Sequence, residues 1–282
     1  MVGVLGVSAS AILVRFSQAP SGVTAAYRLG WTVLLLLPVV LLRCRAELRR
    51  VTARDLVLCG ASGVLLALHF LTWFESLKRT SVASSTVLVS TEVIFTALGF
   101  ALFLHGKIPR LGVWAILMAF GGSALLALSG GGGAGELSGN LLALAAASAA
   151  AVYTLIGRIQ RGHLSTTVYT FLTYLACFLT LLLGTAAAGT PLTGYGGREW
   201  LIGLALAVLC TLLGHSLFSW CLKYVSPSYV SAAKLCEPVF SSLAAIPLFG
   251  EVPGPLQLAG GAAVLGAVLL YTWAEREKTP AG

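Results

Sequence analysis

Of the 282 residues in this 29.3 kDa chain, 57% are hydrophobic and only 10% are charged, and the mean hydropathy is +0.92. A soluble domain carries about 25% charged residues, so this chain lacks the polar material to cover a soluble core, and a soluble enzyme is excluded. The formal net charge of +8 is explained by Lys and Arg retained in cytoplasmic loops, rather than by a nucleic-acid partner. We therefore expect the lipid bilayer to be the solvent of this protein.

The apolar residues are arranged as a polytopic all-α membrane protein requires. Only helices and closed barrels satisfy every backbone polar group in a bilayer. Barrel strands alternate apolar and polar residues, whereas 33–42 and 141–152 are apolar almost without a break. We expect ten transmembrane helices, the first of which is a retained helix and not a cleaved signal. In chain order they are predicted at 2–16, 23–42, 55–77, 82–104, 111–129, 141–159, 166–188, 200–224, 229–249 and 256–273.

The distribution of basic residues predicts the orientation. If the N-terminus is cytoplasmic, twelve Lys and Arg fall in the inner loops and five in the outer ones, and Lys234, inside a helix, completes the eighteen. Positive charge is retained on the cytoplasmic side. We predict a multi-pass protein of the cell inner (cytoplasmic) membrane with both termini in the cytoplasm and the glycine-rich segment 130–135 outside.

The two halves of the chain carry an internal repeat. Residues 76–81 (SLKRTS) resemble 221–226 (CLKYVS) at a shift of 145 positions, and the same shift aligns Glu92 with Glu237 and Phe95 with Phe240. Five helices per repeat is an odd number, so the second repeat must enter the membrane inverted. We predict repeats at 1–129 and 141–282, joined by a connector at 130–140, with a site between them as in alternating-access transporters.

The second repeat contains a familiar motif. Residues 221–228 (CLKYVSPS), followed by Glu237-Pro238 and Gly250-Glu251, resemble the signature of the EamA-like family in the drug/metabolite transporter superfamily. Residues 76–84 are a degraded copy, and the likeness covers essentially the whole chain. It implies that helices one to four and six to nine surround a central cavity, with helices five and ten to the side. Val93 and Gly106 replace Pro238 and Glu251 in the first repeat, so a proline kink is expected only in the ninth helix.

Three ionisable residues are predicted at bilayer depth, where a charge costs at least about 2.5–3.5 kcal/mol and suggests a function. They are Glu92, Lys234 and Glu237. Lys234 and Glu237 are spaced i, i+3 and can form a local ion pair. Glu92 has no basic residue three or four positions away, so we expect it to bind a coupling proton, a substrate ammonium, or Lys234 across the cavity. Arg28 and Glu75 lie near predicted helix ends, where a side chain can snorkel, and rank lower.

Aromatic and histidine side chains complete the predicted site. The candidates for substrate binding, besides Glu92, Lys234 and Glu237, are Trp73, Tyr153, Trp220 and Tyr229. Aromatic rings beside an acid can bind a quaternary ammonium, and aromatic residues also form interfacial belts. His69 and His215 occupy nearly equivalent places in the two repeats. Either can relay protons or make an ordinary structural hydrogen bond.

These features favour a secondary active transporter that moves small polar metabolites by alternating access. A lysine and a carboxylate facing one cavity suit a zwitterion, so proton-linked amino-acid export is the leading interpretation, and export rests on the family resemblance. The alternatives are a transporter of cationic or quaternary amines and an integral membrane enzyme, against which the chain lacks HExxH and GxSxG motifs. The six cysteines form no CxxC pair, so we expect no disulfide, metal or cofactor. Small-residue ladders in the fifth and tenth helices suit packing within a monomer or a homodimer seam.

Overall fold

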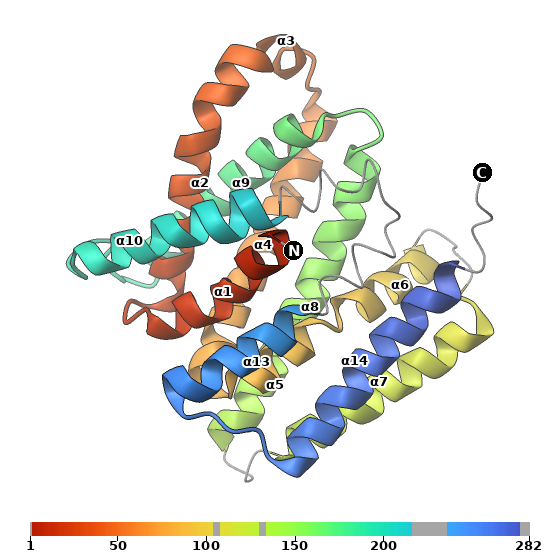
Figure 1. The fold of residues 1–282 in the computed structure, drawn as a ribbon. Helices are drawn as coiled ribbons and strands as arrows, with labels where there is room; N and C mark the ends of the chain where they lie inside the picture. Colours follow the sequence, from red (N-terminus) through yellow and green to blue (C-terminus); the bar gives the residue numbers. More distant parts are fainter. Residues whose placement is uncertain (1, 104–107, 130–133, 216–235, 277–282) are drawn as a thin grey trace.

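The computed structural model describes residues 2–103, 108–129, 134–215 and 236–276, and every regular element in these ranges is a helix (Figure 1). Seven helices are long and apolar enough to cross a membrane, and three shorter apolar helices lie at the positions of the other predicted spans. The prediction of a polytopic α-helical membrane protein is thereby confirmed.

The first half follows the predicted order with two corrections. The first correction is a short helix, α3, inside the arginine-rich segment 43–54, where a loop was predicted. The second is a break at Ser90 and Thr91, which divides the predicted fourth helix in two. The elements are α1 (Val2–Phe16), α2 (Ser21–Arg43), α3 (Arg45–Leu48), α4 (Ala53–Arg79), α5 (Val82–Val89), α6 (Glu92–Phe103) and α7 (Arg110–Ser129).

The second half also departs from the prediction at two places. The helix predicted at 141 begins seven residues earlier, and the predicted eighth helix changes from α-helix to π-helix after Ala205. The elements are α8 (Ala134–Gln160), α9 (Thr166–Ala187), α10 (Gly197–Ala205), η1 (Leu206–His215), α13 (Cys236–Phe249) and α14 (Pro255–Arg276). Residues 216–235 lie outside the described residues. They hold the junction between the predicted eighth and ninth helices and the turn that a kink at Pro238 would bend.

Hydroxyl side chains fix several helix starts. Thr52 and Asp55 form a capping box at the start of α4. Ser81 accepts a hydrogen bond from the Ser84 amide at the start of α5, and Ser165 accepts one from the Val168 amide at the start of α9. Each cap satisfies an amide that the first helical turn leaves without a backbone partner. These starts lie within two residues of the predicted ones.

The helices form a main bundle and a separate pair. In the main bundle α4 packs against α8, α9 and α2, while α1 packs against η1 and α13. Helices α7 and α14 lie side by side at one edge of the molecule (Figure 1). A Cβ added at Gly122 of α7 would lie 2.9 Å from the Gly260 carbonyl oxygen of α14, so small residues allow this close approach. The ladders therefore pack within one chain.

Candidate substrate site

A fully buried arginine lies at the centre of the main bundle. Arg28 in α2 has 0% of its surface exposed, so the expectation that it snorkels out of the bundle is wrong. Its Nε donates a 2.9 Å hydrogen bond to Thr211 of η1, and its Nη1 donates a 3.1 Å bond to Ser10 of α1. The guanidinium carbon lies 4.4 Å from the ring centre of Phe70 in α4. The Nη2 atom has no hydrogen-bond partner in the part of the chain that the structure describes.

Groups on α9, α13 and η1 also act on this guanidinium. It interacts electrostatically with Glu237 of α13, Tyr174 of α9 and Cys210 of η1. No carboxylate of the described residues lies within 4.0 Å of it, since the ion pairs of these residues do not include Arg28. Glu237 is partly buried in the first turn of α13. Arg28 and Glu237 therefore place opposite charges in one region of the bundle without a direct hydrogen bond.

Glu92 has a different setting from the predicted one. It was placed in the middle of a continuous helix, but it is the first residue of α6, directly after the break. Its Oε1 accepts a 2.8 Å hydrogen bond from Thr154 of α8. Among the described residues, no Lys, Arg or His forms an ion pair with Glu92. The N-terminal end of a helix favours negative charge, so this position lowers the cost of an ionised carboxylate in the bundle.

Hydroxyl side chains form hydrogen bonds on and next to the break. Ser85 accepts a hydrogen bond from Ser76 at 2.9 Å, and Ser90 donates one to the Thr86 carbonyl at 2.9 Å. Thr91 donates to the Leu88 carbonyl at 2.6 Å. The Ser90 and Thr91 hydroxyls thus bond to carbonyl groups in the last turn of α5.

The predicted aromatic and histidine residues fall into two groups. His69 and Trp73 are both buried in α4, with ring centres 5.8 Å apart, and the Nδ1 atom of His69 donates to the Ala146 carbonyl at 2.9 Å. Within the described ranges, the Trp73 Nε1 atom has no hydrogen-bond partner. Tyr153 of α8 precedes Thr154 and interacts electrostatically with Glu92. The second group, Trp220, Tyr229 and Lys234, lies outside the described residues, as does the side chain of His215 at the end of η1.

One end of the bundle is held by a carboxylate that the repeat comparison singled out. Glu251, in the α13–α14 connection, accepts a 2.9 Å bond from Arg15 of α1 and a 2.7 Å bond from the Val82 amide of α5. We call these three residues the Glu251 latch. At the same end the buried Glu199 of α10 accepts a 2.6 Å bond from Ser17. Carboxylates from the second half thus bind the ends of first-half helices.

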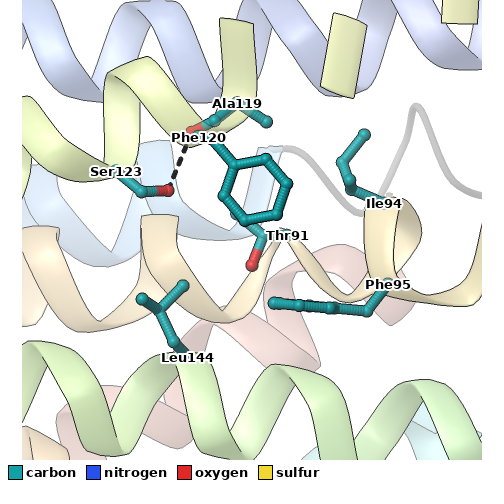
Figure 2. A pocket seen from close by; sticks show the side chains of 7 residues that line it. All are labelled: Thr91, Ile94, Phe95, Ala119, Phe120, Ser123 and Leu144. Atoms are coloured by element: carbon teal, nitrogen blue, oxygen red, sulfur yellow. Dashed lines mark hydrogen bonds between the residues drawn. The ribbon is translucent and has the colours of Figure 1, made fainter. Parts of the chain in front are cut away.

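A small pocket lies next to the helix break at Ser90 and Thr91. Figure 2 shows this pocket enclosed by α7, α8 and the segment where α5 meets α6. Its lining residues are Thr91, Ile94, Phe95, Ala119, Phe120, Ser123 and Leu144. The Ser123 hydroxyl donates to the Ala119 carbonyl of its own helix at 2.8 Å, the dashed line in Figure 2. The cavity of about 10 Å³ has room for about one water molecule. It is too small to bind a metabolite.

Known proteins resemble the chain over most of its length. The pseudopaline exporter CntI of Pseudomonas aeruginosa is 24% identical over 73% of this chain and 72% of its own. A probable terminal-alkyne amino-acid exporter of Streptantibioticus cattleyicolor is 27% identical over 79% and 75%. The uncharacterized transporter YwfM of Bacillus subtilis is 29% identical over 78% and 74%.

A solved crystal structure shares the fold. It has a TM-score of 0.64 at 18% identity and covers 96% of this chain and 94% of its own. The model of the EamA-like transporter family matches residues 1–128 and 137–273, one match in each half of the chain. The chain is therefore a multi-pass membrane protein that belongs to the EamA-like transporter family.

Proposed function

We propose that this protein is a secondary active transporter that exports amino acids or amino-acid-derived metabolites by alternating access, coupled to protons. The observation that carries the proposal is the presence of charges of both signs in one bundle, namely the fully buried Arg28 and the partly buried carboxylates Glu92 and Glu237. An amino acid carries an ammonium and a carboxylate, so it is complementary to such a set. The two relatives named as exporters of pseudopaline and of a terminal-alkyne amino acid support this substrate class and direction.

Helix pairing supports the inverted repeat that alternating access requires. The third predicted helix, α4, packs on α8 and α9, which are the first two helices of the second half. Its counterpart in the second half, α10 with η1, packs on α1 and α2, the first two of the first half. The two halves exchange equivalent contacts, as expected for a pseudo-two-fold axis in the membrane plane.

Proton coupling is proposed for Glu92. The Oε1 atom of Glu92 accepts a hydrogen bond from the neutral hydroxyl of Thr154, and no cation of the described residues forms an ion pair with Glu92. A carboxylate in this setting can exchange a proton or a substrate ammonium without first breaking an ion pair. The paired arrangement of Lys234 and Glu237 stays a prediction from their spacing.

The alternative of a quaternary-amine transporter is weaker. Such a substrate needs an aromatic face free of other cations. The ring of Phe70, beside His69 in α4, already has the Arg28 guanidinium 4.4 Å from its centre. A resident cation at this position repels a cationic substrate.

Reconstituted proteoliposomes test the proposal. Purified protein in liposomes loaded with a radiolabelled amino-acid mixture should catalyse efflux of unmodified solutes, and an imposed pH gradient should accelerate it. Empty liposomes measure passive leak, and chromatography of the released label separates a transporter from an enzyme. Efflux equal to that of empty liposomes for every amino acid would contradict the proposed substrate class, and efflux independent of the pH gradient would contradict proton coupling.

A further inference from the structure

We infer that Arg28 binds the carboxylate of the transported solute through its free Nη2 group, an assignment that rests on the proposed function and adds the substrate group each charge recognises. Glu92 then binds the ammonium or the coupling proton, and Glu237 contributes its negative charge to the region around Arg28. Arg28, which ranks low among the candidates predicted from the sequence, thereby becomes a substrate-binding residue. The assignment depends on the hydrogen-bond inventory of this one side chain.

The guanidinium has five N–H groups, and only two are used. One bond goes to the Thr211 hydroxyl from Nε and one to the Ser10 hydroxyl from Nη1. Both N–H groups of Nη2 and one of Nη1 have no hydrogen-bond partner among the described residues. These three lie at the tip of the planar fork, which matches the two oxygens of a carboxylate. A fully buried charged donor without a partner costs free energy, so the vacant tip favours an anionic ligand.

The partners of Arg28 orient it without neutralising it. Thr211 and Ser10 are uncharged, and Phe70 offers a ring face 4.4 Å from the guanidinium carbon. Glu237 acts on Arg28 electrostatically but forms no hydrogen bond with it. A purely structural arginine in a membrane is expected to be hydrogen-bonded to its counter-ion. Here the counter-charge is present and the fork remains open.

Two further features of the same core fit a ligand site. Trp73 belongs to the same buried cluster as Phe70 and has an indole N–H without a partner. Thr211, which holds Nε, lies in the π-helix η1, and π-helical segments are frequent at functional sites. A second unused donor and an irregular helix thus accompany the open guanidinium.

The test compares acids with their amides in wild-type and Arg28 variants. Efflux from proteoliposomes is measured for L-leucine and L-methionine and for L-leucinamide and L-methioninamide. Arg28→Gln removes the charge, and Arg28→Lys keeps the charge but loses the fork. We expect KM for the acids to rise about 10- to 100-fold in both variants, the factor for one charge-assisted hydrogen bond, while the amides change little. Arg79→Gln, which removes an exposed arginine paired with Glu75 at 2.8 Å, is the matched control.

A binding assay separates failure of this inference from failure of the proposed function. Thermal unfolding of the purified protein is followed with sodium propionate and with propionamide, and ligand binding to the folded state raises the Tm. A propionate-specific rise that Arg28→Gln abolishes supports the inference even where no amino acid is transported. Arg28→Lys keeps the positive charge of the buried side chain. If this variant transports both acids with the KM of the wild type, the inference about Arg28 is overturned, whereas the proposal of amino-acid transport is not. Equal responses to propionate in wild type and variant would also overturn the inference.

Discussion

The Glu251 latch yields a prediction whose size follows from the structure. Glu251 accepts from the Val82 amide at 2.7 Å and from Arg15 at 2.9 Å, and the two side chains of the ion pair are 17% and 29% exposed. A hydrogen bond to a charged group contributes about 1.5–3 kcal/mol, whereas a partly exposed ion pair adds at most about 1 kcal/mol. We expect Glu251→Ala to destabilise the closed arrangement of this end by about 2 kcal/mol, using the lower part of the range because the site is partly exposed.

This free energy corresponds to a factor of about 30 in the equilibrium between the closed and locally opened states. Hydrogen exchange followed by mass spectrometry measures that equilibrium directly, because the Val82 amide is the donor. Peptides covering residues 80–84 should exchange about 30-fold faster in Glu251→Ala. Glu251→Gln keeps an acceptor for Val82 but loses the ion pair, so its effect should be smaller.

The chain offers a matched control at a different connection. Glu47 in α3 accepts a 2.6 Å hydrogen bond from the Ser165 amide at the start of α9. Glu47→Ala should therefore accelerate exchange near 165–168 and leave 80–84 unchanged. Unaltered exchange at 80–84 in a folded Glu251→Ala protein would refute the latch.

Three further predictions test the site, the packing and the orientation. Glu92→Gln should abolish transport in a folded protein, whereas Glu136→Gln, in the first turn of α8, should transport normally; an active Glu92→Gln variant with unchanged pH dependence would remove Glu92 from the mechanism. Gly63→Ala should lower the free energy of unfolding by about 1–3 kcal/mol, because its Cβ would lie 2.7 Å from the Thr173 carbonyl oxygen. The Tm of the variant purified in detergent should therefore be lower than that of the wild type. Gly60→Ala, with no atom within 4 Å, should not lower the Tm. A cysteine at Thr193 in a cysteine-free background should react with impermeant reagent outside intact cells; reaction only after permeabilisation would reverse the predicted topology.

The helix positions could be predicted because residues that end membrane helices separate the apolar runs clearly. Long apolar runs end at Pro20, at the arginine-rich segment after α2, and at residues 253–255, which hold two prolines and a glycine. Capping residues such as Thr52 and Ser165 then fix the first turn. The break before Glu92 was missed because residues 82–98 contain neither proline nor glycine. A Ser-Thr pair directly before an acidic residue is a helix-start signal, and it was present in the sequence.

Arg28 was misjudged for a different reason. Its burial depends on four partner helices, α1, α4, α9 and η1, and a single helix sequence does not show which neighbours cover it. One signal was nevertheless available. Ser21, Thr24, Arg28 and Thr32 lie three or four residues apart, and all four are buried. A polar stripe at helical spacing in an otherwise apolar helix indicates a face turned toward the protein interior.

The irregular helices and the buried charges occur together, and the bilayer gives a reason for this. An ionised carboxylate within an unbroken membrane helix receives no amide from its own helix, because those amides are already paired. The break at Ser90 and Thr91 makes Glu92 the first residue of a new helix, where the helix dipole favours its charge. Similarly, Thr211 holds Arg28 from a π-helix, in which the backbone bonding is already altered. Charge and irregular backbone are therefore parts of one arrangement, and a substitution that restores a regular helix at Ser90 and Thr91 is expected to impair Glu92 even though the carboxylate is retained.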